Sequence, residues 1–594
     1  MKAFKSLCVG LVVILGACQN EKVQTTIVES PIFYEPDPPV WTFNDDEVEL
    51  GTTDFETFDI EPDYSKLEEK LWIDPNKKMY VENINFKNHV EIYYRGEKVI
   101  VKAGNSDFYV NTDGAHVTVN SDKSLVCDLY GKSEDGSLNI LGDCKVRVNL
   151  NGLNLKNTKG PAIGCQSKKI CFIVTDSASV LADGSVYEYP NKDVCMNGCV
   201  CSKGYIAFSG KARLKIFANG ADAIHSGKTV FIRRGTDIDI NSSAKSAIKA
   251  KNRVDIEGGV INIISTGHGG HGIAAKKEVN IAGGRTTIIS NTGIGINGKN
   301  SRGIKSDSLV AIKGGIVRVK DSSVGGKGIR AGKKFIAKNC IVDVLTFGQD
   351  DKTTGSKNRG IKGEEEIRID SARVRVRTEN GWNEGLSTRR KVCINNSLVE
   401  LKTRDDCISA GQPKLADVEI NNARVYAHSG MDAIDSNGTV HINGGVVFAI
   451  AQSHLCRGVD CDVYEFKIAP EATVVTVGQI TSKPTTRLLE QPVCFVERPI
   501  TDKFFCLSST GTDNNLISFD TPKLRFSNSG YRVLVSTPGM IRNNTFDFCN
   551  KAMVKPKHTF HGLAIGGTAR DKNITAQHKL TEMYNVLDMT NTGN

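Results

Sequence analysis

The chain has 594 residues, a formal net charge of +9, 39% hydrophobic and 7% aromatic residues, and 57 glycines. This composition excludes a membrane-spanning helical bundle, because such a bundle needs several long apolar runs that the chain does not contain. A turn-rich chain of this kind favours soluble β-structure, and at this length one repeat array is as compatible with it as several separate domains.

The first residues, "MKAFKSLCVGLVVILGAC", predict export. Lys2 and Lys5 precede an apolar stretch, Leu7 to Leu15, that is too short to span a bilayer. Small residues then lead to Cys18, and this order resembles a bacterial lipoprotein signal. We therefore expect residues 1–17 to be removed and Cys18 to carry a lipid that anchors the protein to a membrane of the cell envelope, on its periplasmic or exposed side. A plain secretory signal is the alternative.

Charge divides the exported chain into an acidic arm and a basic body. Acidic residues far outnumber basic ones between residues 18 and 75, which predicts a solvated linker, and the rest of the chain has a basic excess. A basic body attracts polyanions. Export and the lack of a basic, aromatic-studded helix or zinc-finger spacing argue against nucleic acid, so we expect an acidic polysaccharide.

A repeat of about 25 residues occupies residues 76–465. Each copy begins with an apolar anchor, and in seven of nine copies another isoleucine follows eight residues later. The anchors are Ile224, Ile248, Ile273, Ile304, Ile329, Ile361, Leu386, Ile408 and Ile434.

Turn residues follow the second apolar position of most copies. They are pairs such as Gly258-Gly259, Gly283-Gly284, Asn395-Asn396 and Asn421-Asn422, which tolerate positive φ. A third alternating segment comes next, so each copy predicts three short strands joined by turns. This is one coil of a parallel β-helix. Leucine-rich, ankyrin and tetratricopeptide repeats do not fit, because their signatures are absent.

The stretches "VNLNGLNLKNTKGPAIGCQSKKICFIVTDSASVLADGSVYEY" (148–189) and "CSKGYIAFSGKARLKIFANGADAIHSGKTVFI" (201–232) resemble bacterial carbohydrate-binding lipoproteins with a pectate-lyase-like β-helix. The resemblance extends from about residue 79 to about residue 540. It implies an all-β, right-handed parallel β-helix that binds cellulose-like or acidic polysaccharide, with Ca²⁺ at turn carboxylates. We expect residues 466–594 to form a β-rich C-terminal cap, with a short helix near the end.

Aligned on the anchors, two columns of side chains run along the predicted coils, about 4.8 Å apart from one coil to the next. One column lies two residues before each anchor, and the other lies one residue after it. Three neighbouring copies place only cations there: Arg302, Lys305, Lys327, Arg330, Arg359 and Lys362. We predict that they bind carboxylated or sulfated sugars. Alternatively, solvent and nearby acids such as Asp307 and Glu364 to Glu366 neutralise an ordinary charged face.

The same columns become acidic towards the end of the repeats. They hold Glu384, Asp406, Asp432 and Asp435, and Asp222 occupies the slot near the beginning. Stacked carboxylates repel unless a cation joins them, so we predict a Ca²⁺ site here, with Asp222 the weaker candidate. The alternative is an acidic rim neutralised by Arg404 and Arg457. The middle copies depart from the aspartate that the family commonly has in the earlier slot, which argues against Ca²⁺ there.

Other side chains carry weaker signals. Trp382, in "ENGWNEG", is either a sugar-stacking platform or a turn residue that caps the core. Two histidines in "TGHGGHG", His268 and His271, favour a surface loop over a metal site. Fifteen cysteines remain in an oxidising compartment, and the nearest pairs along the chain are disulfide candidates. These pairs are Cys165/Cys171, Cys456/Cys461 and Cys494/Cys506.

The sequence leaves three classes of function open. A non-catalytic polysaccharide-binding lipoprotein agrees with the extended cationic columns and with the absence of nucleophile-elbow, Walker and HExxH motifs, and for it we assign no catalytic residue. A Ca²⁺-dependent uronan lyase would use a basic side chain near the acidic column. A structural or adhesive surface protein would need only the solenoid itself.

Overall fold

The computed structural model describes residues 80–81, 84–104, 107–188, 195–292, 300–453, 455–462, 464–520 and 530–587. The predicted signal (1–17), the lipid-carrying Cys18 and the predicted linker (18–75) lie outside these residues. None of the helices within the described part is long and apolar enough to cross a membrane.

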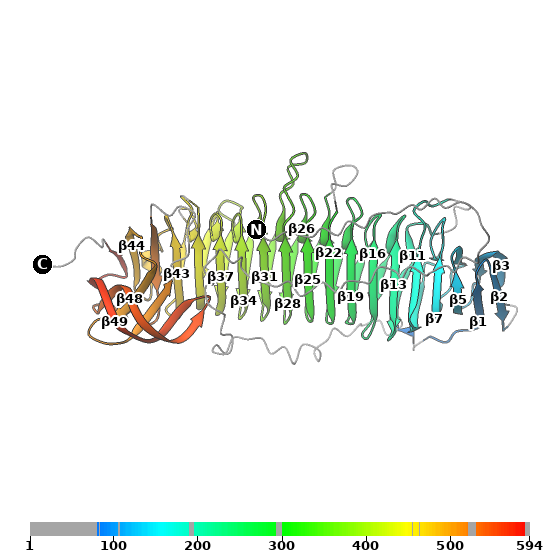
Figure 1. Ribbon diagram of the computed structural model, residues 1–594, viewed down its shortest axis with the longest axis horizontal. Helices are drawn as coiled ribbons and strands as arrows, with labels where there is room; N and C mark the ends of the chain where they lie inside the picture. Colours follow the sequence, from blue (N-terminus) through cyan, green and yellow to red (C-terminus); the bar gives the residue numbers. More distant parts are fainter. Residues whose placement is uncertain are drawn as a thin grey trace, which may run out of the picture. The chain divides into compact units, whose positions relative to one another are not determined.

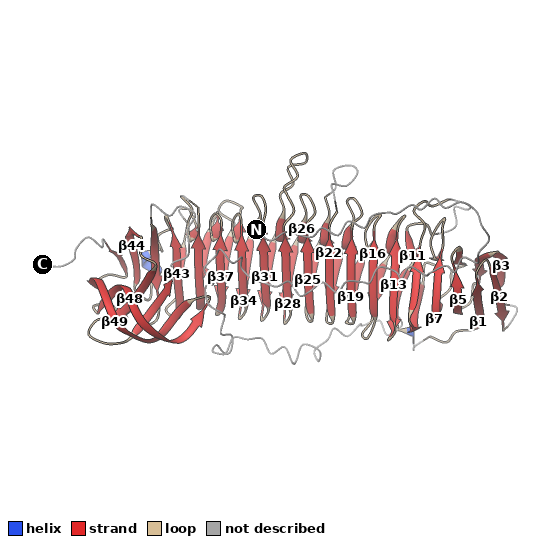
Figure 2. Cartoon of the chain, viewed as in Figure 1, coloured by secondary structure: helices blue, strands red, loops and turns tan. Residues whose placement is uncertain are grey.

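The described chain is almost entirely β-structure, arranged as coils that stack side by side (Figures 1 and 2). Each coil of the repeat contributes three strands in a fixed order. We call the strand that holds the anchor row 1, the next strand row 2, and the third strand row 3. Neighbouring coils pair in parallel in all three rows, which confirms the predicted parallel β-helix.

Row 1 is a 15-stranded sheet, parallel except for its first strand. Its strands are β3 (Tyr109–Asp113), β4 (Ala115–Asn120), β6 (Gly136–Leu141), β8 (Ile163–Cys165), β11 (Gly198–Ser202), β14 (Asp222–Ser226), β17 (Ile248–Ala250), β20 (His271–Ala275), β23 (Arg302–Ser306), β26 (Lys327–Ala331), β29 (Arg359–Gly363), β32 (Glu384–Thr388), β35 (Ile408–Ala410), β38 (Ile434–Ser436) and β41 (Val459–Asp460).

Rows 2 and 3 belong to one 31-stranded sheet. Row 2 contains β1 (Asn88–Arg95), β2 (Lys98–Ala103), β5 (Leu125–Ser133), β7 (Val146–Lys156), β9 (Ile170–Ser177), β12 (Tyr205–Gly210), β15 (Thr229–Ile232), β18 (Arg253–Ile256), β21 (Glu278–Ile281), β24 (Leu309–Ile312), β27 (Lys334–Lys338), β30 (Glu366–Asp370), β33 (Lys391–Asn395), β36 (Asp417–Asn421), β39 (Thr439–Ile442) and β42 (Phe466–Ile468). Row 3 contains β10 (Ser179–Ala182), β13 (Arg213–Ala218), β16 (Asp237–Ser242), β19 (Val260–Ser265), β22 (Arg285–Ser290), β25 (Ile316–Asp321), β28 (Ile341–Thr346), β31 (Arg373–Thr378), β34 (Leu398–Thr403), β37 (Ala423–Ser429), β40 (Gly445–Ala451) and β43 (Ala472–Gly478).

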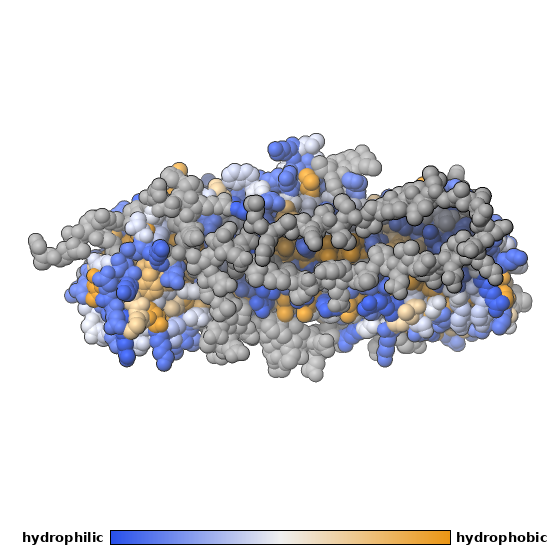
Figure 3. Space-filling view, viewed as in Figure 1, coloured by the Kyte–Doolittle hydropathy of each residue, from blue (hydrophilic) through white to orange (hydrophobic). Residues whose placement is uncertain are grey.

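The anchors stack in register through row 1, as the repeat spacing predicts. Ile304 pairs with Ile329, which pairs with Ile361, and all three side chains are fully buried. Burying such a ladder of aliphatic side chains is the main stabilising contribution to each coil. The predicted turns are also confirmed: Gly259 has φ of 92° and Asn396 has φ of 45°. Hydrophilic side chains cover most of the described surface that Figure 3 shows, with smaller apolar patches among them.

The predicted β-rich cap follows row 3. Its strands are β44 (Val493–Ile500), β45 (Phe504–Ser509), β46 (Asn515–Asp520), β47 (Tyr531–Ser536), β48 (Thr545–Phe560), β49 (Leu563–Lys579) and β50 (Tyr584–Leu587), after a 3-10 turn at Thr486–Leu488. Strand β47 pairs antiparallel with β43, and β45, β46, β48 and β49 close into a barrel. The short helix expected near the end is wrong, because the alternating residues before Lys579 continue β49 instead.

The described cysteines are buried and none of them is disulfide-bonded, so the three disulfide candidates are not formed. Sequence proximity was a poor guide, because strand pairing selects other partners. Cys506 lies directly opposite Cys549 on β48, rather than beside Cys494. Cys456 contacts the sulfur of Met431 at 3.8 Å. Of the candidates, Cys165 and Cys171 are in contact within the core, where a hydrogen bond between the thiols and burial raise the pKa of Cys171.

Candidate functional site

The two cationic columns predicted from the sequence lie side by side on row 1. Arg302, Lys327 and Arg359 are successive partners in the parallel ladder, and so are Lys305, Arg330 and Lys362. The columns differ in exposure, because the loops before each strand cover the pre-anchor column more than the other. We call them the pre-anchor and post-anchor columns.

The pre-anchor column is mostly covered. Lys327 is 5% exposed, and its Nζ donates to Ser356 Oγ at 3.0 Å and to the Lys357 carbonyl at 3.0 Å. Burial and the neighbouring Arg302 lower the pKa of Lys327 to about 6. Burial also lowers the pKa of Arg302 to about 10, and this guanidinium donates to the Gly325 carbonyl at 3.3 Å. These two side chains support the coil and present little charge to a ligand.

Arg359 holds Glu384 through a two-pronged ion pair. Its Nε lies 2.5 Å from Glu384 Oε2, and its Nη2 lies 3.1 Å from Oε1. The pKa of Glu384 is lowered although burial opposes ionisation, because the hydrogen bond and charge of Arg359 outweigh the burial. Both oxygens of this predicted metal ligand therefore already face a cation.

The post-anchor column is the accessible one. The side chains of Lys305, Arg330 and Lys362 are 33%, 27% and 20% exposed. Each has a carboxylate neighbour: Lys305 Nζ lies 3.7 Å from Asp307, and Glu364 Oε1 lies 3.4 Å from Arg330 and 3.1 Å from Lys362. The local acids named in the alternative interpretation thus contact these cations. Partly exposed pairs of this kind are weak and exchange readily with a competing anion.

A cavity of about 660 Å³ adjoins the same face, where the post-anchor column continues through His225 and Lys249. Its lining combines Asp222, His225, Lys249, His271 and Lys305. His271 begins strand β20 and is half-buried, so the expectation of a surface loop is wrong for this residue. Burial and the cations Lys305 and Arg302 hold the pKa of His271 well below its usual range.

Asp222, the weaker metal candidate, lies in this cavity with basic side chains as partners. Its Oδ2 is 2.9 Å from His225 Nδ1 and 3.7 Å from Lys249 Nζ, and its Oδ1 accepts the Ser246 N–H at 3.0 Å. Both oxygens are therefore engaged by donors of this chain. This environment differs from the cluster of carboxylate and carbonyl oxygens that Ca²⁺ takes.

The acidic columns gather at the β35, β38 and β41 coils. Asp435 pairs in register with Asp460, and Asp406 Oδ1 accepts the Asp432 N–H at 3.0 Å. Burial and the surrounding carboxylates raise the pKa of Asp406 to about 9, of Asp435 to about 7 and of Asp432 to about 6. Asp406, Asp432 and Asp435 thus form an acidic cluster whose members disfavour one another's ionisation, which a bound cation would relieve.

Trp382 lies in the turn before β32, with 57% of its surface exposed, and its backbone N–H donates to Asp350 Oδ2 at 3.2 Å. An indole that is this exposed does not cap the core. This exposure favours the sugar-stacking platform over the core-capping role, because a flat apolar face is available to a sugar ring.

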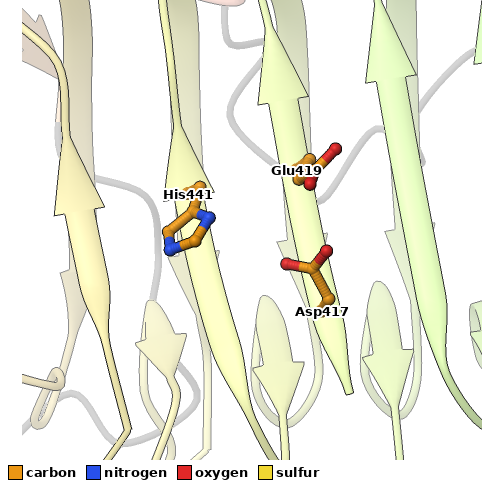
Figure 4. Close-up of side chains that lie close together, drawn as sticks. All are labelled: Asp417, Glu419 and His441. Atoms are coloured by element: carbon orange, nitrogen blue, oxygen red, sulfur yellow. The ribbon is translucent and has the colours of Figure 1, made fainter. Parts of the chain in front are cut away.

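One chemically notable group was missed in the sequence. Asp417 and Glu419 on β36 converge with His441 on β39, on the outer face of row 2 (Figure 4). The signal was available, because Glu419 and His441 directly precede the second apolar position of their repeats, Ile420 and Ile442. Aligning the repeats on that position would have placed the two residues in adjacent coils.

Comparisons with known proteins place these coils in a family. The model of the carbohydrate-binding domain-containing protein family matches residues 113–270 and 269–454, which is more than half of the chain. A polysaccharide lyase-like protein from C. thermocellum, solved as a gadolinium derivative, is 24% identical, with a TM-score of 0.35 over 41% of this chain and 94% of that one. No curated protein matches. The chain belongs to the family of carbohydrate-binding domain-containing proteins.

Proposed function

We propose that this protein is a non-catalytic lipoprotein of the cell envelope that binds acidic polysaccharide along the outer face of row 1. The observation that carries the proposal is the post-anchor column, in which Lys305, Arg330 and Lys362 stack in register and remain partly exposed. Coils repeat about every 4.8 Å, so this face offers an extended polyanion one cation after another.

The carboxylates beside these cations set the strength of binding. Asp307 and Glu364 lie 3.1 to 3.7 Å from them, so an anionic sugar has to replace partners that the column already has. The net gain for each contact is therefore small, and affinity accumulates over several coils. Binding of this kind weakens as salt rises, because the pairs are exposed to solvent.

We propose that Trp382 adds an apolar contact for the sugar chain. It precedes β32, the coil after the cationic ones, and it is exposed. Stacking of a sugar ring on this indole would add a contact that does not depend on charge. We assign Arg302, Lys327 and Arg359 a supporting role, because their side chains are covered or already paired.

The acidic cluster is the site we propose for Ca²⁺. Asp406, Asp432 and Asp435 offer hard oxygen ligands, and burial together with neighbouring carboxylates raises the pKa of all three, a cost that a bound cation would relieve. Glu384 and Asp222 fit less well, because Glu384 is paired with Arg359 and Asp222 lies 3.7 Å from Lys249 Nζ. Ca²⁺ bound at the cluster would neutralise this end of the face and admit anionic sugars to it.

The test exchanges the post-anchor cations. The triple variant Lys305→Glu, Arg330→Glu, Lys362→Glu should lose binding to polygalacturonate, measured by affinity electrophoresis or calorimetry at low salt. A matched control, Lys313→Glu, Lys320→Glu, Lys338→Glu, makes the same change in net charge on exposed lysines outside row 1 and should retain binding. Equal affinity of the triple variant and the wild-type protein would rule out this face as the binding site.

Uronan lyase activity is the second candidate function. It is favoured by the side chains that line the cavity beside the post-anchor column. His225 is held by Asp222 at 2.9 Å beside Lys249, an arrangement in which an imidazole can accept a proton next to a cation that neutralises a sugar carboxylate. Incubation with polygalacturonate, with and without Ca²⁺, distinguishes the two functions. Ultraviolet absorbance of unsaturated products that disappears in His225→Ala would establish the lyase and end the purely binding interpretation.

A further inference from the structure

Asp417, Glu419 and His441 form a compact set of donor atoms away from the proposed sugar-binding face. One atom from each lies within 4.8 Å of the other two, and within the described part of the chain this is the one group of three His, Cys, Asp or Glu side chains that meets this limit. All three side chains are partly exposed. They belong to row 2, whereas the post-anchor cations and the acidic cluster belong to row 1.

The strands fix these side chains on the outside of the coil. Val418 and Ile420 alternate with Asp417 and Glu419 along β36 and are buried in the core, so the two carboxylates point outwards. His441 is the ladder partner of Glu419 on the next coil. Thr439 Oγ1 donates to Asp417 Oδ1 at 2.8 Å and orients that carboxylate. The group is therefore held by backbone register rather than by a loop.

The imidazole is oriented by a further carboxylate. His441 Nε2 lies 3.1 Å from Glu465 Oε1, which favours the tautomer with its proton on Nε2. Figure 4 shows the other ring nitrogen turned towards β36, the strand that carries Asp417 and Glu419. A histidine whose second nitrogen is engaged by a carboxylate, and whose first nitrogen faces two more, has the usual arrangement of a metal ligand with its outer support.

A cation of the protein itself already occupies the space between the carboxylates. Lys391 Nζ lies 2.9 Å from Asp417 Oδ2 and 2.6 Å from Glu419 Oε1. Lys391 is the ladder partner of Asp417 on the preceding coil, so the ammonium group arrives from the side opposite His441. The position thus attracts positive charge. A divalent metal ion carries twice the charge of the ammonium group, and unlike that group it can also be coordinated by the imidazole nitrogen of His441.

We propose that Asp417, Glu419 and His441 bind a divalent transition-metal ion of the Zn²⁺ type, which displaces the ammonium group of Lys391. One imidazole nitrogen and two carboxylates suit Zn²⁺. They do not suit Ca²⁺, which takes oxygen ligands only. The ion joins β36 to β39 and therefore links two coils, so binding stabilises the stack.

The experiment titrates ZnCl₂ into the purified full-length chain after removal of any histidine tag, with calorimetry and thermal unfolding as the two measurements. We expect saturable binding of one ion at this site and a rise in the melting temperature. His441→Ala and Asp417→Asn should each weaken binding by at least about tenfold, as loss of one ligand from a small set does. Lys391→Gln should tighten binding, because the competing ammonium group is gone.

Matched controls separate this site from general effects. Lys334→Gln removes a row 2 lysine that pairs with Glu366 at 2.7 Å but has no comparable histidine, and it should leave Zn²⁺ affinity unchanged. Excess CaCl₂ should not displace Zn²⁺. Far-ultraviolet circular dichroism verifies that each variant is folded. The proposal is overturned if the wild-type protein shows no saturable Zn²⁺ binding, or if folded His441→Ala and Lys391→Gln both bind Zn²⁺ as the wild type does.

Discussion

Single aspartates in the acidic cluster make stability depend on pH. Asp406 has a pKa of about 9 and Asp435 a pKa of about 7, both raised first by burial and then by neighbouring carboxylates. In the unfolded chain each aspartate titrates near its usual value of about 3.9. The folded state therefore binds protons more tightly, so these groups lower stability at alkaline pH, and the penalty is relieved as pH falls from about 9 towards 4.

We predict that, without Ca²⁺, the melting temperature falls as pH is raised from 6 to 9, and that Asp406→Asn flattens this dependence. The amide resembles the protonated acid in shape and carries no charge, so the variant should be more stable than the wild type at pH 9. Thermal unfolding in chelator-treated buffers provides the measurement. A variant that is less stable than the wild type at pH 9 would show that the Asp406 charge is not under repulsion.

Addition of Ca²⁺ should stabilise the folded chain through the same aspartates. A ligand that binds only the folded chain raises its melting temperature, so we predict a Ca²⁺-dependent rise that is larger at pH 9 than at pH 6, where more of the carboxylates are protonated. Asp406→Ala with Asp432→Ala should abolish this rise. The control pair Asp122→Ala and Glu471→Ala removes two exposed acids elsewhere and should preserve it. An equal rise in both double variants would exclude the cluster as the Ca²⁺ site.

At the scale of the strand, a glycine precedes the anchor in five of the nine copies and permits close packing inside the coil. A Cβ atom at Gly328 would lie 2.3 Å from Val344 Cγ1 and 2.9 Å from the Gly360 carbonyl oxygen. The neighbouring coils repeat this arrangement, with Gly303 against Val319 and Gly360 against Val376. In these coils the row 1 backbone thus approaches the row 3 side chains too closely for any other residue.

We predict that Gly328→Ala lowers stability by about 1–3 kcal/mol, the usual cost of overpacking a core. Adding Val344→Ala should recover part of this loss, because it removes the methyl group that the new Cβ meets. Gly411→Ala, where nothing lies within 4 Å of the added Cβ, should change stability little. Denaturant unfolding compares the four proteins. If Gly328→Ala and Gly411→Ala behave alike, the close approach is not what requires glycine.

Local regularity explains which parts of the structure the sequence could predict. The anchors recur at nearly constant spacing, so their register, the turns at Gly259 and Asn396 and the stacking of the charged columns followed from the repeat. Loop lengths between strands vary, and no repeat rule determines what those loops cover. The burial of Lys327 and the pairing of Arg359 with Glu384 depend on such loops. The group of Asp417, Glu419 and His441 could be found from the sequence only by aligning the repeats on their second apolar position, rather than on the anchor.

At the scale of the whole described chain, the C-terminal cap covers the last coil and also contacts earlier coils of row 3. Strand β47 pairs antiparallel with β43 and covers what would otherwise be an exposed edge strand. The β48–β49 hairpin then brings His561 against earlier coils of row 3. Its Nε2 lies 3.0 Å from Glu400 Oε1, and its ring stacks on Tyr426 with 3.9 Å between centroids. The cap and the coils therefore share a polar and an aromatic contact.

The two contacts at His561 can be separated, because phenylalanine keeps a flat ring and loses the nitrogen. Buried Glu400 has its pKa lowered against the effect of burial, through the His561 hydrogen bond and charge and then Arg373 and Arg375. Loss of the nitrogen therefore leaves a buried carboxylate with fewer partners, which costs about 1–3 kcal/mol.

We predict that the melting temperature decreases from the wild type to His561→Phe and further to His561→Ala, which also loses the stacking on Tyr426. In a Glu400→Gln background the step from histidine to phenylalanine should shrink, because the carboxylate that the His561 nitrogen contacts is already absent. Thermal unfolding of these variants measures the coupling between cap and coils. Equal steps in both backgrounds would mean that Glu400 and His561 contribute independently, and that stacking and strand pairing alone hold the hairpin against row 3.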